Sequence, residues 1–217
     1  MSRWLEFILL YGVLPALCIF KIIPVQIIGM LALTCICCVV VLLNDRTFDR
    51  RLLRLTLPPT RQIVSLVLPF LISACVLIAC TWLFQRETFF WLPRKAPLFW
   101  LLIITLYPVI SVVPQEVIYR VYFFHRFGKM FGSPAIANFV CAGIFGLHHW
   151  AFHNWIAVAL TLIGGFKFAR TYRQTRSLFT VSIEHAFYGG LLFTIGLGVY
   201  FMSGTYSFAR HLLPPGH

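Results

Sequence analysis

Long apolar runs alternate with short basic segments along this chain. A helix that spans a bilayer needs about 20 mostly apolar residues, and seven runs approach or meet that length. They cover residues 5–20, 25–43, 62–84, 98–113, 134–147, 155–168 and 178–202. The pattern predicts an all-α bundle of about seven transmembrane helices.

The fourth run is followed at once by Pro114 and then by Glu116. Proline removes a backbone donor and kinks a helix. The basic residues Arg126 and Lys129, further along, are typical of the cytoplasmic end of a span. We therefore expect this helix to continue past a kink at Pro114 to about residue 127, which places Glu116 near mid-depth.

Composition supports a membrane protein. Hydrophobic residues make up 60% of the 217 residues and charged residues only 11%, whereas a soluble domain averages about 25% charged residues. So few charges cannot cover a soluble surface. We expect one transmembrane domain over residues 1–217, with a motif-bearing core at about residues 98–202.

The net charge of +12 comes from Lys and Arg that lie between the apolar runs. This placement favours the positive-inside rule and contact with the anionic headgroups of the lipid bilayer, and it excludes nucleic acid as a partner. The basic segments 44–61, 120–129 and 167–176 fall on one side when the spans alternate, which predicts a cytoplasmic N-terminus. The short loops favour a prokaryotic cytoplasmic (inner) membrane.

Ionisable residues are rare in the later runs, and those present come from three helices or helix ends. They are Glu116, Arg120, His148, His149, His153, Glu184 and His185. Because a charge in hydrocarbon is costly, such groups indicate a site in the core of a bundle. Glu116 and Arg120 are four residues apart, so they share a helix face and can pair.

On the residues alone, three uses of these side chains remain open. A metal would be held by His149 and His153, which are four apart, together with His185 and Glu116, although the His-Glu-x-x-His motif of metalloproteases is absent. Without a metal, Glu116 would activate water, and His149 and His185 would share the proton and stabilise an oxyanion. In the third, Glu116 only pairs with Arg120 and the histidines only bond between helices.

Three short motifs resemble those of the CAAX-protease and bacteriocin-processing family, whose members are intramembrane glutamic proteases. Residues 115–120 read Gln-Glu-Val-Ile-Tyr-Arg, residues 145–149 read Phe-Gly-Leu-His-His, and residues 185–189 read His-Ala-Phe-Tyr-Gly. The family pattern is Glu-Glu-x-x-x-Arg, then Phe-x-x-x-His, then His-x-x-x-Asn or Asp. The order and spacing match across about a third of the chain. The myxosortase-like group, which removes C-terminal sorting tails, is one of the subgroups that this resemblance leaves open.

The resemblance implies a role for each matched side chain. Glu116 would act as the base, His149 would work with it on water, and His185 would help to bind the developing oxyanion. Gln115, Arg120 and Phe145 lie at matched positions and would support them, and His148 and Glu184, which the motifs do not match, are further supporting candidates. The family uses no cofactor and no metal, and the implied substrate is a membrane-anchored protein or peptide that is cleaved internally or at its C-terminal tail.

Two positions depart from the family pattern. Gln115 stands in place of the first glutamate and Gly189 in place of Asn or Asp. A glutamine cannot accept a proton, so either Glu116 takes the base role or the chain is a degenerate, non-proteolytic member of the family. Glu184 is a conceivable substitute, although adjacent residues on a helix point about 100° apart. The rivals to an intramembrane endopeptidase are a metal-dependent intramembrane protease, a non-catalytic scaffold or immunity protein, and a transporter with a proton relay.

Overall fold

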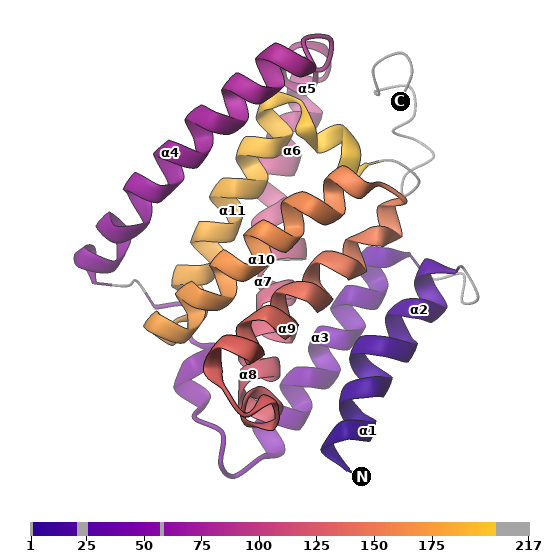
Figure 1. Cartoon of the computed structure of the whole chain (residues 1–217), viewed down its shortest axis with the longest axis vertical. Coiled ribbons are helices and arrows are strands. Elements are labelled where there is room, and N and C mark those ends of the chain that lie inside the picture. The colour runs from indigo at the N-terminus through magenta and orange to yellow at the C-terminus, as the bar shows by residue number, and fades with distance from the viewer. Residues whose placement is uncertain (1, 21–25, 57–58, 203–217) are drawn as a thin grey trace.

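The computed structural model describes residues 2–20, 26–56 and 59–202, and every regular element in these ranges is helical. The first part of the chain forms α1 (Arg3–Ile8), α2 (Leu14–Ile19), α3 (Ile27–Asn44), α4 (Thr60–Phe84) and the short α5 (Trp91–Lys95). The second part forms α6 (Pro97–Tyr107), α7 (Val113–Glu116), α8 (Phe123–Arg126), α9 (Pro134–His148), α10 (Trp155–Thr175) and α11 (Leu178–Ile195). Figure 1 shows these helices side by side in one bundle, which confirms the all-α prediction.

Five helices among the described residues are long and apolar enough to cross a membrane, judged by length and composition. They are Ile27–Asn44, Thr60–Phe84, Pro97–Arg126, Pro134–Phe152 and Leu178–Ile195. The chain is therefore an integral membrane protein. Two of the seven predicted spans are not among these five. The run at 5–20 forms a helix over residues 3–19 that is shorter than any of them, and α10 carries Lys167 and Arg170 in its second half.

The elements α6, α7 and α8 belong to one continuous helix of 30 residues, Pro97–Arg126. This confirms that the fourth span continues past Pro114. Two π-helical turns, Pro108–Val112 and Val117–Tyr122, lie on either side of α7. Proline has no N–H to donate and disturbs the regular helix, and π-turns are frequent at functional sites. Glu116 lies between the two turns, in the interior of the helix.

Polar caps begin the three helices that follow. Ser133 accepts from the Ile136 amide, Asn154 from the amides of Ile156 and Ala157, and Ser177 from the Thr180 amide; such caps satisfy the free donors of a first turn. Two glycines let α9 and α10 approach closely. A Cβ on Gly146 would collide with Leu162, and one on Gly165 would lie 3.0 Å from Cδ1 of Phe145. Small residues at such crossings are typical of membrane helices.

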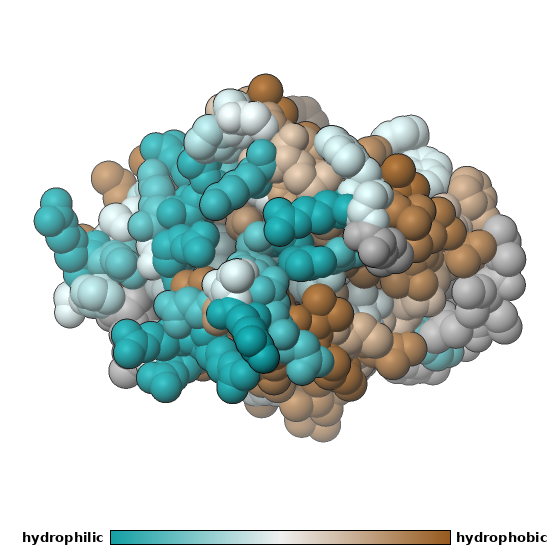
Figure 2. All heavy atoms as spheres, turned by 90° about the horizontal axis from the view of Figure 1, so that it is seen from below, coloured by the Kyte–Doolittle hydropathy of each residue, from teal (hydrophilic) through white to brown (hydrophobic). Residues whose placement is uncertain are grey.

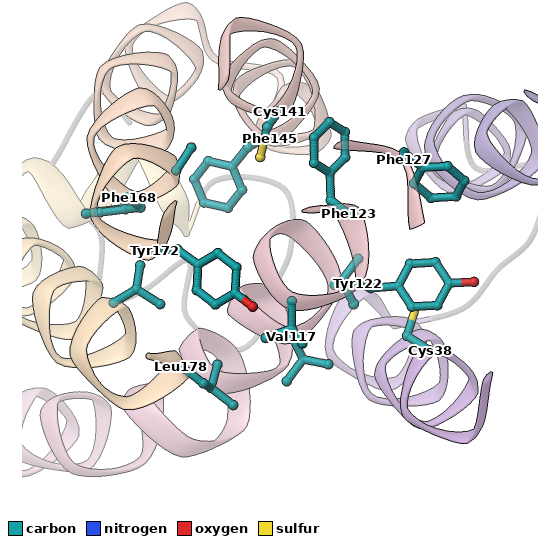
Figure 3. Close-up of a cluster of buried hydrophobic side chains, with 14 of the residues drawn as sticks. Cys38, Val117, Tyr122, Phe123, Phe127, Cys141, Phe145, Phe168, Tyr172 and Leu178 are labelled. Atoms are coloured by element: carbon teal, nitrogen blue, oxygen red, sulfur yellow. The ribbon is translucent and has the colours of Figure 1, made fainter. Parts of the chain in front are cut away.

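The central helix Pro97–Arg126 also carries much of the core. Figure 3 shows its side chains packed among those of α3, α9, α10 and α11. The cluster includes Cys38, Val117, Tyr122, Phe123, Phe127, Cys141, Phe145, Phe168, Tyr172 and Leu178. Large aromatic rings dominate the energetics of such a core because each buries much apolar surface. The cluster therefore holds together the helices that carry the three sequence motifs.

Hydrophilic side chains gather at the lower end of the bundle, which Figure 2 shows from below. At this end, Arg126 donates to Glu6 through Nε and Nη2, at 3.0 Å and 2.6 Å, and lies 3.4 Å from Asp45. Nε2 of His125 lies 3.0 Å from the same Asp45 carboxylate. The hydroxyl and amide of Thr47 donate to Asp45, and with His125 they hold the pKa of that carboxyl well below its usual range. These contacts tie α1, α3 and α8 together.

Candidate active site

Glu116 and Arg120 form a fully buried pair in the central helix, as their spacing predicts. Nε of Arg120 lies 3.3 Å from Oε2 of Glu116, close enough for an ion pair but not aligned as a hydrogen bond. The guanidinium also lies 4.6 Å from the centre of the Phe145 ring. Oε2 of Glu116 and Nη1 of Arg120 have no hydrogen-bond partner among the described residues. Buried polar atoms are nearly always paired, so these two require an explanation.

His185 of α11 supplies the direct partner of Glu116. Its Nδ1 lies 2.7 Å from Oε1 of Glu116, and its Nε2 lies 3.1 Å from the hydroxyl of Tyr107. A carboxylate can only accept, so Nδ1 carries the proton, and Nε2 of the neutral imidazole accepts from the phenol. The ring stacks on Phe168, with centroids 4.6 Å apart and planes at 19°. Tyr107, His185, Glu116 and Arg120 thus form one chain of polar contacts, in which Tyr107 is partly exposed and the other three are buried.

The His149 ring packs against Phe145, the aromatic side chain that also contacts Arg120 and His185. Nδ1 of His149 donates to the carbonyl oxygen of Phe145 at 2.7 Å, so Nε2 of the neutral ring is an acceptor. The Phe145 ring lies 4.7 Å from the His149 ring and 5.7 Å from the His185 ring. The structure therefore brings Glu116 and His185 into contact, and Phe145 packs against both histidine rings.

His148 is held on both sides by structural groups. Its Nε2 donates to the carbonyl of Tyr11 at 2.8 Å, and its Nδ1 accepts from the hydroxyl of Tyr119 at 2.7 Å. The Tyr11 carbonyl belongs to a π-helical turn, Leu9–Val13, and the Tyr11 hydroxyl donates in return to the carbonyl of Ile118 at 2.7 Å. His148 therefore joins the N-terminal helix to the central helix.

The metal set considered from the sequence is not assembled. Helix α9 ends at His148, a 3-10 turn follows, and His153 has a left-handed backbone with φ of 52°. His149 and His153 therefore do not share one helix face, because the helix on which that spacing depends has already ended. Within the described residues, no three His, Cys, Asp or Glu side chains are grouped so that they could hold a metal ion.

The structure shows the surroundings of the two departures from the family pattern, Gln115 and Gly189, and of the substitute carboxylate Glu184. Gln115 donates through Nε2 to Oγ of Ser111 at 2.7 Å, while its Oε1 is buried without a partner. Glu184 is almost fully buried and lies 3.0 Å from Nζ of Lys167 on α10, so it is already paired. Gly189 lies against Tyr107.

Sequence reasoning missed Tyr107 and Phe168, two of the side chains that contact the His185 ring. Neither belongs to a motif, and each is one aromatic residue among many in an apolar run. A Cβ on Gly189 would lie 2.7 Å from Cζ of the Tyr107 ring. The missing side chain at 189 was therefore the one signal that another residue fills that space.

A buried carboxylate held by an imidazole, at the centre of a membrane bundle, is suited to acid–base chemistry. Residues 97–191 match the family model described as Rce1-like, Type II CAAX prenyl endopeptidase Rce1-like. This segment contains all three motifs and is similar to an Rce1-like domain, which implies peptidase activity on protein or peptide substrates. Comparison with curated proteins found no match, and comparison with solved structures found none either.

Proposed function

We propose that the chain is a glutamic-type intramembrane endopeptidase in which the Glu116–His185 pair activates water. The observation that carries the proposal is the 2.7 Å contact between Nδ1 of His185 and Oε1 of Glu116, in full burial. This contact holds one carboxylate oxygen in place. The other oxygen, Oε2, has no hydrogen-bond partner in the described part of the chain and is the atom suited to receive a proton.

In the proposed reaction, Oε2 of Glu116 takes a proton from water as the water oxygen attacks the scissile carbonyl carbon. The carbonyl oxygen becomes an oxyanion, to which we assign Nη1 of Arg120 as a charged donor, because this atom has no hydrogen-bond partner among the described residues. The C–N bond then breaks, and Glu116 returns the proton to the leaving amine. His185 aims its N–H at Glu116, so we assign it the task of holding the carboxylate. It can donate to the oxyanion from Nε2 only after it takes a second proton.

His149 keeps a supporting part in this proposal. Its Nδ1–H is used by Phe145, so its free Nε2 is an acceptor that can hold a water molecule or the leaving amine. The proposed substrate is a membrane-anchored peptide or a C-terminal tail of the kind removed by myxosortase-like proteases. We further propose seven spans, with residues 3–19 and α10 added to the five apolar helices, a cytoplasmic N-terminus and a prokaryotic inner membrane.

The test measures cleavage of a co-expressed tailed substrate by purified variants. Glu116→Gln should abolish cleavage, and Glu87→Gln, a matched change at an exposed glutamate, should not. His185→Gln keeps groups that can bond to both neighbours but cannot be protonated, so it should retain part of the activity if Glu116 is the base. Cleavage should survive metal chelators. Full activity of Glu116→Gln would end the proposal.

A further inference from the structure

Tyr107 is the last residue of α6 and lies nine positions before Glu116 on the same long helix. Its hydroxyl lies 3.1 Å from Nε2 of His185, on the opposite side of the imidazole from Glu116. The ring packs edge-on against Phe193, at 5.5 Å between centroids and 69° between planes. The phenol is thus directed at the one nitrogen of His185 that Glu116 does not hold.

The place that the phenol occupies exists because residue 189 has no side chain. A Cβ at Gly189 would lie 2.5 Å from the Tyr107 oxygen and 2.7 Å from Cζ, and would also collide with Cε1. Real Cβ atoms do not approach other atoms so closely, so any larger residue at 189 would force the phenol away from His185. Gly189 and Tyr107 are therefore a matched pair, one opening the space that the other fills.

We propose that Tyr107 is a positioning residue of the peptidase, whose O–H donates to Nε2 of His185 and so keeps the imidazole proton on Nδ1, aimed at Glu116. It does the work that a polar side chain at 189 would do, from a different helix. The inference rests on the proposed function of the Glu116–His185 pair. It adds the reason why this site is complete with glycine at 189.

The physical consequence is a fixed tautomer. If the imidazole proton moved to Nε2, this N–H and the Tyr107 O–H would be two donors facing each other. Glu116 would also lose the N–H that His185 donates to it. Without the hydroxyl, the ring can turn or change tautomer, and a buried acceptor is left unpaired. Leaving this buried acceptor without a donor should lower the rate by about 5- to 150-fold. The loss should fall on kcat, because Tyr107 is argued to act through His185 and not on the substrate.

The first experiment compares Tyr107→Phe with Tyr188→Phe in the full-length protein. Tyr188 donates its hydroxyl to Ser73 on α4 at 3.2 Å, away from His185, so it is a matched control. Tyr107→Phe should lower kcat by about 5- to 150-fold with little change in KM. It should also shift the pH dependence of kcat and the ¹⁵N NMR signals that report the His185 tautomer. Tyr188→Phe should do neither.

The second experiment exchanges the pair. Gly189→Asn alone should inactivate, because the new side chain meets the Tyr107 ring, and Tyr107→Ala alone should also be slow. The double variant Tyr107→Ala/Gly189→Asn should recover kcat at least tenfold over either single variant, because a polar group again reaches His185. This recovery cannot come from variants that merely fail to fold.

Wild-type kcat and pH profile in Tyr107→Phe would overturn the inference, provided that Glu116→Gln is inactive in the same assay. A lowered kcat with an unchanged pH profile and tautomer would overturn it too, because the hydroxyl would then be only structural. If Glu116→Gln itself remains active, it is the proposed function that has failed, and that outcome is seen independently of any Tyr107 variant.

Discussion

Replacing Arg120 by methionine tests how much the buried ion pair contributes to the stability of the folded protein. Arg120 is fully buried, and its contacts include Nε to Glu116 at 3.3 Å, Nη2 to the Gly165 carbonyl at 3.5 Å, and Cζ over the Phe145 ring at 4.6 Å. Methionine keeps an unbranched apolar side chain in the cavity but removes the charge. Glu116 would then be a carboxylate without a counter-charge inside the bundle.

The expected loss can be estimated from these contacts. Breaking a buried ion pair by removing one partner costs about 3–5 kcal/mol, whereas exposed pairs contribute about 0–1 kcal/mol. The Gly165 hydrogen bond is long and adds little. At about 1.36 kcal/mol per factor of ten, Arg120→Met should lower the folded-to-unfolded ratio by roughly 10²- to 10⁴-fold. The double variant Glu116→Gln/Arg120→Met has no buried charge and should recover most of this stability, although not the cleavage.

The assay is heat- or denaturant-induced unfolding of the purified protein in detergent micelles, followed by its helical circular dichroism. Arg170→Met is the matched control, because Arg170 is exposed on α10. It should unfold within about 0.5 kcal/mol of the wild type, as surface changes usually do. The reasoning is refuted if Arg120→Met is as stable as the control, or if the double variant is no more stable than Arg120→Met alone.

Three further predictions concern groups around the site. Lys167→Met should destabilise the protein by about 1–3 kcal/mol in the same unfolding assay, because it leaves the buried carboxylate of Glu184 unpaired. Adding Glu184→Gln should restore stability, and equal stability of the single and double variants would contradict this. Because the pKa of Asp45 is lowered on folding, its contribution to stability is present above its unfolded pKa and is lost as the pH falls below about 4. Asp45→Asn should therefore flatten the acid limb of a stability–pH curve, and an unchanged limb would show that the Thr47 hydrogen bonds do not matter. His148→Ala should destabilise the protein by about 1–3 kcal/mol through its two lost hydrogen bonds and leave the pH profile of kcat unchanged, whereas a shifted profile would place His148 in the chemistry.

Local spacing could be predicted from the sequence, and contacts between helices could not. The pairing of Glu116 with Arg120 follows from four-residue spacing alone, and the length of the fourth span follows from where the basic residues resume. Both are confirmed. The same logic was wrong for His149 and His153, because it assumed a helix that ends before either residue. Spacing is informative only as long as the backbone keeps its period.

The identity of the partner of Glu116 depends on how whole helices are rotated about their axes. His185 reaches Glu116 directly, while His149 is turned toward the carbonyl of Phe145. A motif lists these residues in order but says nothing of that rotation, which is set by side-chain packing along the full length of each helix. Tyr107 was unpredictable for the same reason, since it lies in an apolar run whose other residues face other helices or the outside of the bundle.

Tyr11 and Glu6 connect the N-terminal helix to the segment that matches the family model. Both belong to the helix over residues 3–19, well before the matched segment that begins at residue 97. Yet Glu6 binds Arg126, and Tyr11 binds Ile118 and His148, all inside that segment. The segment that matches the family model is therefore smaller than the part of the chain that these contacts hold together. If residues 97–191 were transferred alone into another protein, the groups that bind Glu6 and Tyr11 would lose their hydrogen-bond partners. A chimera that is meant to fold should therefore include the N-terminal helix as well.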